Sequence, residues 1–167
     1  MKRRVHLLMM IFTGGFFLFV DQVLKWLARS NPDFEYYVVG KWLGWEYMAN
    51  SGIAFSLPFP NWLLVLITPL IIFGLVIWAI RHISRNTYHI THITYHISLI
   101  LVISGALSNF IDRILFSATI DYLRVLTGVI NLADVAIVVG AGAIVWIELR
   151  VKKLNKKEQD IIKLDKM

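Results

Sequence analysis

Three carboxylates lie in or beside two of the most apolar segments of the chain, at Asp112, Asp121 and Asp134. An ionised carboxylate inside a bilayer is energetically costly, so acids that persist there are rare and usually functional. Two carboxylates brought close together in a low-dielectric site share one proton. That state suits peptide hydrolysis, because the ionised acid takes a proton from water and the protonated acid supports the carbonyl oxygen.

Some of the acids favour a structural interpretation. Asp112 stands next to Arg113, and this neighbour pair predicts an internal salt bridge. Asp21 and Lys25 are four residues apart, a spacing at which opposite charges meet on one helical face. We interpret that second pair as structural or as an anchor to lipid headgroups rather than as chemistry.

For Asp121 and Asp134 the catalytic interpretation is preferred, although each has an alternative. Asp121 also fits an ordinary loop acid, and Asp134 fits a carboxylate at a helix N-terminus, where acids are favoured. Both are expected at one membrane level together with Asp21, Asn50 and Asp112, so several separate segments converge there. The five histidines are expected at the opposite side, which leaves no convincing serine–histidine alternative.

The elements that must position these acids are membrane helices. Hydrophobic residues make up 57% of the 167 residues and charged residues 17%, whereas about a quarter of a soluble domain is charged. A spanning helix needs about 20 apolar residues. We predict one integral-membrane domain over residues 1–167, with spans at about residues 5–27, 62–80, 97–116 and 129–147. The absence of cysteine excludes disulfides and cysteine metal sites.

Lysine and arginine are concentrated at the N-terminus, in the loop between the second and third spans, and in the tail at residues 150–167. Such residues mark the cytoplasmic side, so both termini are predicted to be cytoplasmic. The net charge of +6 is therefore a topology signal and does not indicate nucleic acid. The basic, apolar N-terminus imitates a signal peptide, but no small-residue cleavage site follows it. We interpret it as a retained first helix.

The first outer loop has two stretches rich in aromatic and β-branched residues, at residues 34–39 and 41–48. They predict a small extracytoplasmic β-hairpin or sheet attached to an otherwise all-α membrane protein. An aromatic belt at headgroup level and a surface that cradles substrate are equally open interpretations of this segment.

Two further features concern metals and helix packing. His89, His92 and His96 share a helical face, but no carboxylate completes a ligand set, so a polar helix start is favoured over a metal site. We expect no metal and no cofactor. Gly140 and Gly142 in the fourth span predict close helix packing.

Five motifs in this order resemble those of the lipoprotein signal peptidases, the signal peptidase II family. They are Asp21-Gln-Val-Leu-Lys25, Asn50-Ser-Gly-Ile-Ala-Phe55, Gly105-Ala-Leu-Ser-Asn-Phe-Ile-Asp-Arg113, Ile120-Asp-Tyr122 and Asn131-Leu-Ala-Asp134. The resemblance covers nearly the whole chain. It implies an aspartic peptidase of the bacterial inner membrane with its active site at the outer face.

The resemblance also implies the substrate and the site. The substrate would be a prolipoprotein with diacylglycerol on its cysteine, cut just before that cysteine by a monomeric enzyme among membrane lipids. The catalytic pair falls on Asp121 and Asp134. Positions that line or support the site are Asn50, Gly52, Asn109, Arg113, Asn131 and Ala133. Positions with a structural role are Asp21, Lys25, Gly105 and Asp112.

The chain departs from the family pattern at several places. Ser108 stands where the family usually has glycine, and both Tyr122 and Ile130 stand where phenylalanine is usual. The segment between Asp121 and Asp134 is short for the family, which leaves less outer loop to hold the lipid. No departure removes a carboxylate.

Two other classes of function stay open. A transporter or proton relay also uses intramembrane acids, but it predicts polar groups across the full depth. A structural subunit predicts that acids pair one to one with basic residues, for which Arg113 and Arg124 are available. Clustering of the acids on one side favours the peptidase.

Overall fold

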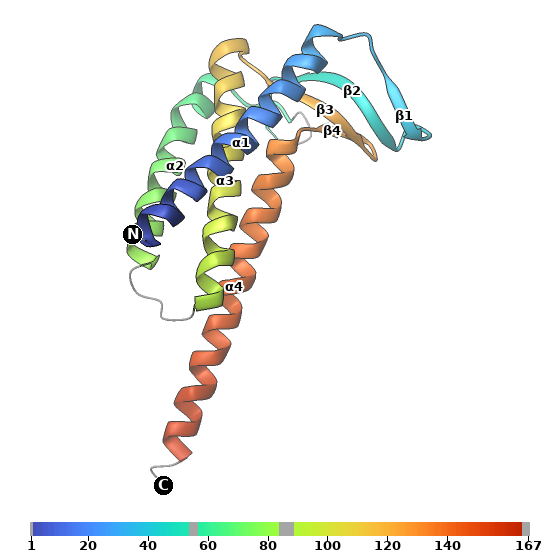
Figure 1. The fold of residues 1–167 in the computed structure, drawn as a ribbon. Coiled ribbons are helices and arrows are strands. Elements are labelled where there is room, and N and C mark those ends of the chain that lie inside the picture. The colour runs from blue at the N-terminus through green and yellow to red at the C-terminus, as the bar shows by residue number, and fades with distance from the viewer. Residues whose placement is uncertain (1, 54–56, 84–88, 165–167) are drawn as a thin grey trace.

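The computed structural model describes residues 2–53, 57–83 and 89–164, which form a helical bundle with a sheet at one end (Figure 1). The helices are α1 (Lys2–Ser30), α2 (Asn61–Ile83), α3 (His89–Phe116) and α4 (Leu132–Leu164). The strands are β1 (Tyr36–Val39), β2 (Leu43–Asn50), β3 (Thr119–Val125) and β4 (Gly128–Ile130). The beginning of α1 and the end of α4 both lie away from the sheet.

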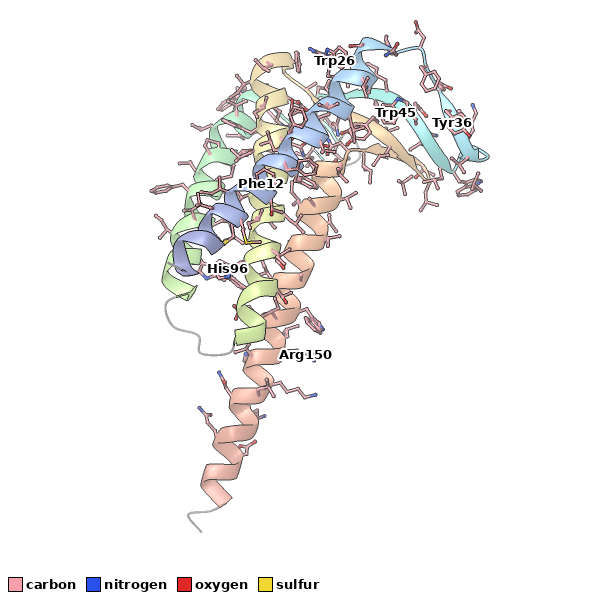
Figure 2. The ribbon with its side chains drawn as sticks, viewed as in Figure 1. Phe12, Trp26, Tyr36, Trp45, His96 and Arg150 are labelled. Atoms are coloured by element: carbon pink, nitrogen blue, oxygen red, sulfur yellow. The ribbon has the colours of Figure 1, made fainter. Side chains whose placement is uncertain are left out.

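All four helices contain a stretch long and apolar enough to cross a membrane: Leu8–Ser30, Asn61–Trp78, Thr94–Phe116 and Leu132–Lys156. Their outward side chains are strongly apolar, as Phe12 at 76% exposure and Trp26 at 58% illustrate on α1 (Figure 2). The four predicted apolar helices are therefore confirmed. The fourth begins later than predicted, because residues 129 and 130 belong to β4. The basic tail continues α4 as a helix to Leu164.

Helix α3 lies at the centre of the bundle and contacts each of the other three helices. Small residues allow this. A Cβ on Gly105 would lie 2.5 Å from the Ala133 carbonyl oxygen, and one on Gly140 would lie 2.5 Å from that of Ser98. Both glycines let α3 and α4 approach closely, which confirms the prediction for Gly140. For Gly142 the prediction was wrong, because nothing lies within 4 Å of its added Cβ.

The sheet has the strand order β1-β2-β3-β4, with every neighbouring pair antiparallel. The predicted hairpin in the first loop is confirmed as β1 and β2. The prediction that the sheet belongs to that loop alone was wrong, since β3 and β4 come from the α3–α4 connection. On one face of β3, Ile120 and Tyr122 pack against Ala28 of α1, and this contact joins the sheet to the bundle.

Candidate active site

Asp121 is a buried residue of the inner strand β3, with 1% of its surface exposed. It pairs in register with Met48 of β2, so the interpretation as an ordinary loop acid was wrong. Its carboxylate accepts hydrogen bonds from Asn131 Nδ2 at 2.6 Å and Asn50 Nδ2 at 3.2 Å. Burial and the nearby charge of Asp134 raise the pKa of Asp121 to about 7, against the opposing effect of the two amide donors.

Asp134 lies in the first turn of α4 and faces the same asparagine. Its own N–H donates to Asn131 Oδ1 at 2.8 Å, and its Oδ2 accepts from the Asn131 N–H at 3.3 Å. This reciprocal pair is a capping box that starts the helix. The remaining oxygen, Oδ1, accepts from Asn109 Nδ2 at 2.8 Å. Capping therefore holds Asp134 in place rather than excluding it from chemistry.

Asn131 connects the two acids directly. Its amide contacts the carboxylate of Asp121, its backbone and Oδ1 contact Asp134, and its Nδ2 also reaches Asn109 Oδ1 at 3.1 Å. The acids thus come from a strand and a helix that both adjoin α3. Two such carboxylates, held by neutral amide donors, form an arrangement able to hold one proton between them and to activate a water.

Arg113 lies beside this pair but does not form the predicted salt bridge with Asp112. Its Nη2 donates to the Gly52 carbonyl oxygen at 2.6 Å, and its Nη1 reaches Asn61 Oδ1 at 3.4 Å. Gly52 is held in turn through its N–H, which donates to Asn50 Oδ1 at 3.0 Å. Arg113 therefore secures the backbone next to Asn50. The end of that motif, at residues 54 and 55, lies outside the described residues.

Asp112 pairs instead with Lys25 of α1, at 2.8 Å. Lys25 also pairs with Asp21 at 3.0 Å, and its Nζ donates to Asn109 Oδ1 at 2.8 Å. All three charged side chains are buried, with the lysine 2% exposed. The predicted pairing of Asp21 with Lys25 is confirmed, whereas the headgroup-anchor interpretation was wrong because both residues are inside the bundle.

This buried charged cluster holds the backbone beside both candidate catalytic acids. Asp112 Oδ2 accepts from the Ile120 N–H at 3.1 Å, one residue before Asp121. Asp21 Oδ1 accepts from the Ala133 N–H at 3.2 Å, one residue before Asp134. The structural roles of Asp21, Lys25 and Asp112 stay predictions.

Three further polar residues join the cluster and carried no assigned role in the sequence reasoning: Gln22, Ser108 and Tyr122. Gln22 Nε2 donates to Asp112 Oδ1 at 3.0 Å, and Ser108 Oγ donates to Asp21 Oδ2 at 2.5 Å. The Tyr122 hydroxyl donates to Asp21 Oδ1 at 2.8 Å. Gln22 and Ser108 both lie inside recognised motifs next to charged or amide residues, and that position was the available signal.

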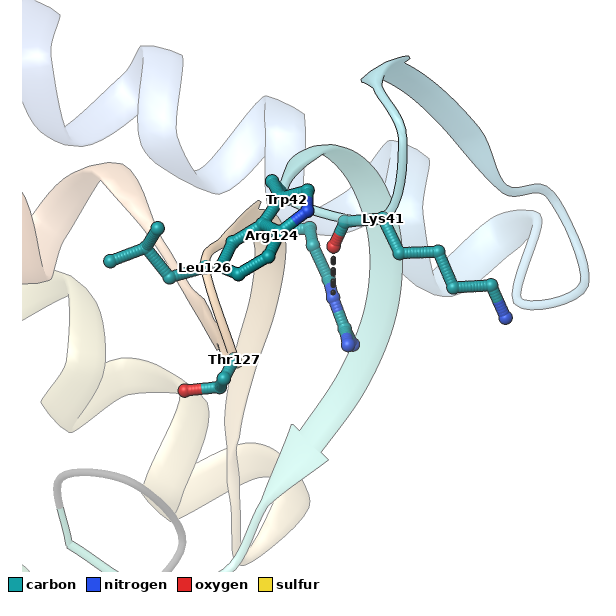
Figure 3. Close-up of a pocket in the computed structure, with 5 residues that line it drawn as sticks. All are labelled: Lys41, Trp42, Arg124, Leu126 and Thr127. Atoms are coloured by element: carbon teal, nitrogen blue, oxygen red, sulfur yellow. Dashed lines mark hydrogen bonds between the residues drawn. The ribbon is translucent and has the colours of Figure 1, made fainter.

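A separate groove of about 330 Å³ lies at the end of β3 away from Asp121 (Figure 3). Its lining residues are Lys41, Trp42, Arg124, Leu126 and Thr127. Arg124 Nε donates to the Lys41 carbonyl oxygen at 3.2 Å, which ties β3 to the β1–β2 turn. Because no carboxylate lines this groove, it does not offer the acid chemistry of the Asp121–Asp134 pair.

The described residues contain no group of three histidine, aspartate or glutamate side chains arranged to hold a metal ion. The side chains of His89 and His92, two of the three histidines considered for a metal site, lie outside the described part of the chain. Helix α3 does begin at His89, as the polar helix start predicted.

The chain is similar to known proteins over most of its length. The model of the family described as Signal peptidase (SPase) II matches residues 13–150. A lipoprotein signal peptidase of Allorhizobium ampelinum is 35% identical over 147 residues, covering 83% of this chain and 86% of that protein. One from Listeria innocua is 31% identical over 129 residues, covering 72% and 80%.

A solved structure described as a bacterial membrane enzyme shares the fold, with a TM-score of 0.73 and 24% identity. The match covers 85% of this chain and 88% of that one. Because the family model spans most of the chain and relatives above 30% identity share most of its length, this chain belongs to the signal peptidase II family of proteases.

Proposed function

We propose that the chain is an aspartic endopeptidase that removes the signal peptide from prolipoproteins carrying diacylglycerol on a cysteine. Asp121 and Asp134 form the catalytic pair, and the cut falls just before the lipidated cysteine. The observation that carries the proposal is the connection of two carboxylates through one asparagine, Asn131, with no ion pair to either acid among the described residues.

The proposed reaction uses water and one proton shared by the two acids. The ionised carboxylate takes a proton from water as the water oxygen adds to the peptide carbonyl carbon. The protonated carboxyl gives its proton to the carbonyl oxygen, which forms a tetrahedral diol. The diol collapses as the first acid protonates the departing cysteine nitrogen and the second takes back a hydroxyl proton. The pair again holds one proton.

The titration of Asp121 supports this mechanism. A pKa of about 7 places its proton transfer near neutral pH, where a shared proton serves both acid and base roles. Neutral amides from Asn50, Asn109 and Asn131 orient the carboxylates without cancelling their charge. The backbone beside these groups is held at two points. Arg113 donates a hydrogen bond to the Gly52 carbonyl oxygen, and Asp21 accepts one from the Ala133 N–H.

The position of the pair suits a substrate anchored in lipid. Asp121 belongs to β3 and Asp134 to the first turn of α4, at the sheet end of the bundle (Figure 1), where an acyl-bearing cysteine would meet the membrane surface. Burial of each acyl CH₂ contributes about 0.8 kcal/mol, so binding free energy comes from the lipid while the acids act on the peptide bond. We propose an enzyme of the bacterial cytoplasmic membrane, active as a monomer at the outer face, with both termini cytoplasmic and residues 1–167 as one domain.

The test is cleavage of a diacylglyceryl-modified prolipoprotein by protein purified in detergent. Asp121→Asn and Asp134→Asn should each lower kcat by about a thousandfold or more, because general acid–base steps contribute up to about 10⁴-fold. Thermal melting in the same detergent checks that both variants remain folded. Cleavage by the asparagine variants at the wild-type rate would refute the pair, and an inert wild type would redirect attention to a proton relay.

A further inference from the structure

Tyr122 follows Asp121 in β3, yet its hydroxyl reaches the helix that carries Asp134. The hydroxyl donates to Asp21 Oδ1 at 2.8 Å and accepts from the Leu132 N–H at 3.1 Å. The side chain is fully buried. One tyrosine therefore connects the strand of the first acid to the opening turn of the helix that holds the second.

The opening turn of α4 is held from outside the helix. Its first N–H groups have no partner within the helix and must find acceptors elsewhere. The Leu132 N–H donates to the Tyr122 hydroxyl, and the Ala133 N–H donates to Asp21 Oδ1 at 3.2 Å. Both groups thus depend on the same aspartate, one directly and one through the tyrosine. These two contacts join the start of α4 to β3 and to α1.

The aspartate at the centre of this arrangement is itself fixed. Its second oxygen, Oδ2, is held by Lys25 Nζ at 3.0 Å and Ser108 Oγ at 2.5 Å, which leaves Oδ1 for Tyr122 and α4. The tyrosine ring packs on Trp45, with the centroids 5.0 Å apart. Burial and the charge of Asp21 raise the pKa of Tyr122, so its hydroxyl stays a proton donor.

We infer that Tyr122 is a positioning residue for the peptidase reaction, whose hydroxyl holds the first turn of α4 and thereby sets Asp134 relative to Asp121. The inference rests on the proposed function. Loss of the hydroxyl leaves the Leu132 N–H without its acceptor, while the ring keeps its packing against Trp45. A reacting pair is sensitive to such a change, since a misplacement of about 1 Å can cost about a hundredfold in rate.

The experiment compares Tyr122→Phe with Tyr37→Phe. The Tyr37 hydroxyl also donates to carboxylates, Glu35 at 2.9 Å and Glu46 at 3.0 Å, but it lies on the edge strand and does not contact α4. Both variants therefore lose a carboxylate-bonded tyrosine hydroxyl from the same sheet. The measurements are kcat and KM on lipidated prolipoprotein, and hydrogen exchange of the α4 opening turn.

For Tyr122→Phe we expect kcat to fall between about tenfold and a hundredfold with KM within about twofold of wild type. Hydrogen exchange should become faster over residues 132–134. For Tyr37→Phe we expect both readouts to stay at the wild-type value. A general loss of stability would also lower the apparent kcat, because less of the enzyme would be folded, but it would not confine the faster exchange to the start of α4.

The two proposals fail in different ways. If wild type cleaves, Asp121→Asn does not, and Tyr122→Phe keeps the wild-type kcat, the proposed function stands and the positioning role is overturned. If Tyr122→Phe and Tyr37→Phe lose the same amount of kcat, the positioning role is likewise overturned. If wild type is inert while Tyr122→Phe still speeds exchange at α4, the hydroxyl contact stands and the peptidase function is refuted.

Discussion

Two pairs of aspartates lie at the sheet end of the bundle, and they differ in what lies between the carboxylates. Asp134 is half-buried, whereas the other three are buried. Asp21 and Asp112 are joined by the lysine ammonium of Lys25, 3.0 and 2.8 Å away. Asp121 and Asp134 are joined by the neutral amide and backbone of Asn131. A buried carboxylate with a cation is compensated in its charged form, whereas burial and the charge of Asp134 raise the pKa of Asp121 to about 7. Asp21 and Asp112 are therefore suited to holding the structure in place, and we call them the supporting pair. Asp121 and Asp134 are suited to proton transfer, and we call them the reactive pair.

The two pairs are also physically connected. Lys25 Nζ donates to Asn109 Oδ1, and Asn109 Nδ2 donates to Asp134 Oδ1, both at 2.8 Å. The positive charge of Lys25 also opposes the upward shift in the pKa of Asp121. The supporting pair thus affects the reactive pair by geometry and by charge. Variants that change one pair at a time show how far each role can be separated.

The largest effect on stability is expected from Lys25→Met, which leaves two buried carboxylates without their cation. Breaking a buried ion pair by removing one partner costs about 3–5 kcal/mol. Thermal and denaturant unfolding in detergent should show this loss, while Lys41→Met, at an exposed lysine of the sheet, changes little. The double variant Lys25→Met/Asp21→Asn restores the net charge of the cluster and should recover part of the stability. A Lys25→Met protein as stable as wild type would contradict the supporting role.

The next largest effect is the pH dependence of the free energy of unfolding that Asp121 contributes. The folded pKa of Asp121, about 7, lies above the ordinary aspartate value of 3.8, so the folded protein holds this proton more tightly than the unfolded chain. Its contribution to the free energy of unfolding is therefore largest below about pH 4 and is lost as pH rises to about 7. The size is on the order of a few kcal/mol.

Asp121→Asn should remove this part of the pH dependence and be at least as stable as wild type near pH 8. The test is to measure the free energy of unfolding of wild type and of Asp121→Asn at intervals between pH 4 and 8. Asp33→Asn, an exposed acid outside the sheet, controls for the loss of one negative charge. Equal slopes in wild type and Asp121→Asn would show that burial does not act on this carboxylate as described.

The smallest effect is expected from Ser108→Ala, which removes a hydroxyl from the supporting pair alone. Ser108 Oγ donates to Asp21 Oδ2 and accepts from Lys25 Nζ at 3.2 Å. Hydrogen bonds to charged groups contribute about 1.5–3 kcal/mol, so stability should fall by about that amount. We expect kcat to stay within about threefold, because this hydroxyl does not touch α4. Ser104→Ala, at another buried serine of α3, is the matched control, and a kcat loss as large as that of Tyr122→Phe would contradict this division of roles.

Much of the fold follows from local pattern. The four spans are visible because each helix contains a long apolar stretch, so composition over about 20 residues is sufficient to find it. The hairpin at β1 and β2 follows from aromatic and β-branched residues around a glycine. Strands β3 and β4 were missed because the polar Asp121 and Arg124 interrupt the apolar pattern of the connection. That segment also offered a signal for them, since two β-branched residues precede the acid, an aromatic residue follows it, and a glycine begins β4.

The sequence by itself determined the helix number and placed the acids at one end of the bundle, because these properties depend on neighbours along the chain. Tertiary structure alone decided which charges meet. Asp112 pairs with Lys25 of α1 and not with adjacent Arg113, because α1 packs on α3 and brings its lysine into the interior. It also decided that Tyr122 reaches Asp21 across 101 residues of chain. Such contacts depend on helix packing and strand register, which bring distant residues together and cannot be deduced from local spacing.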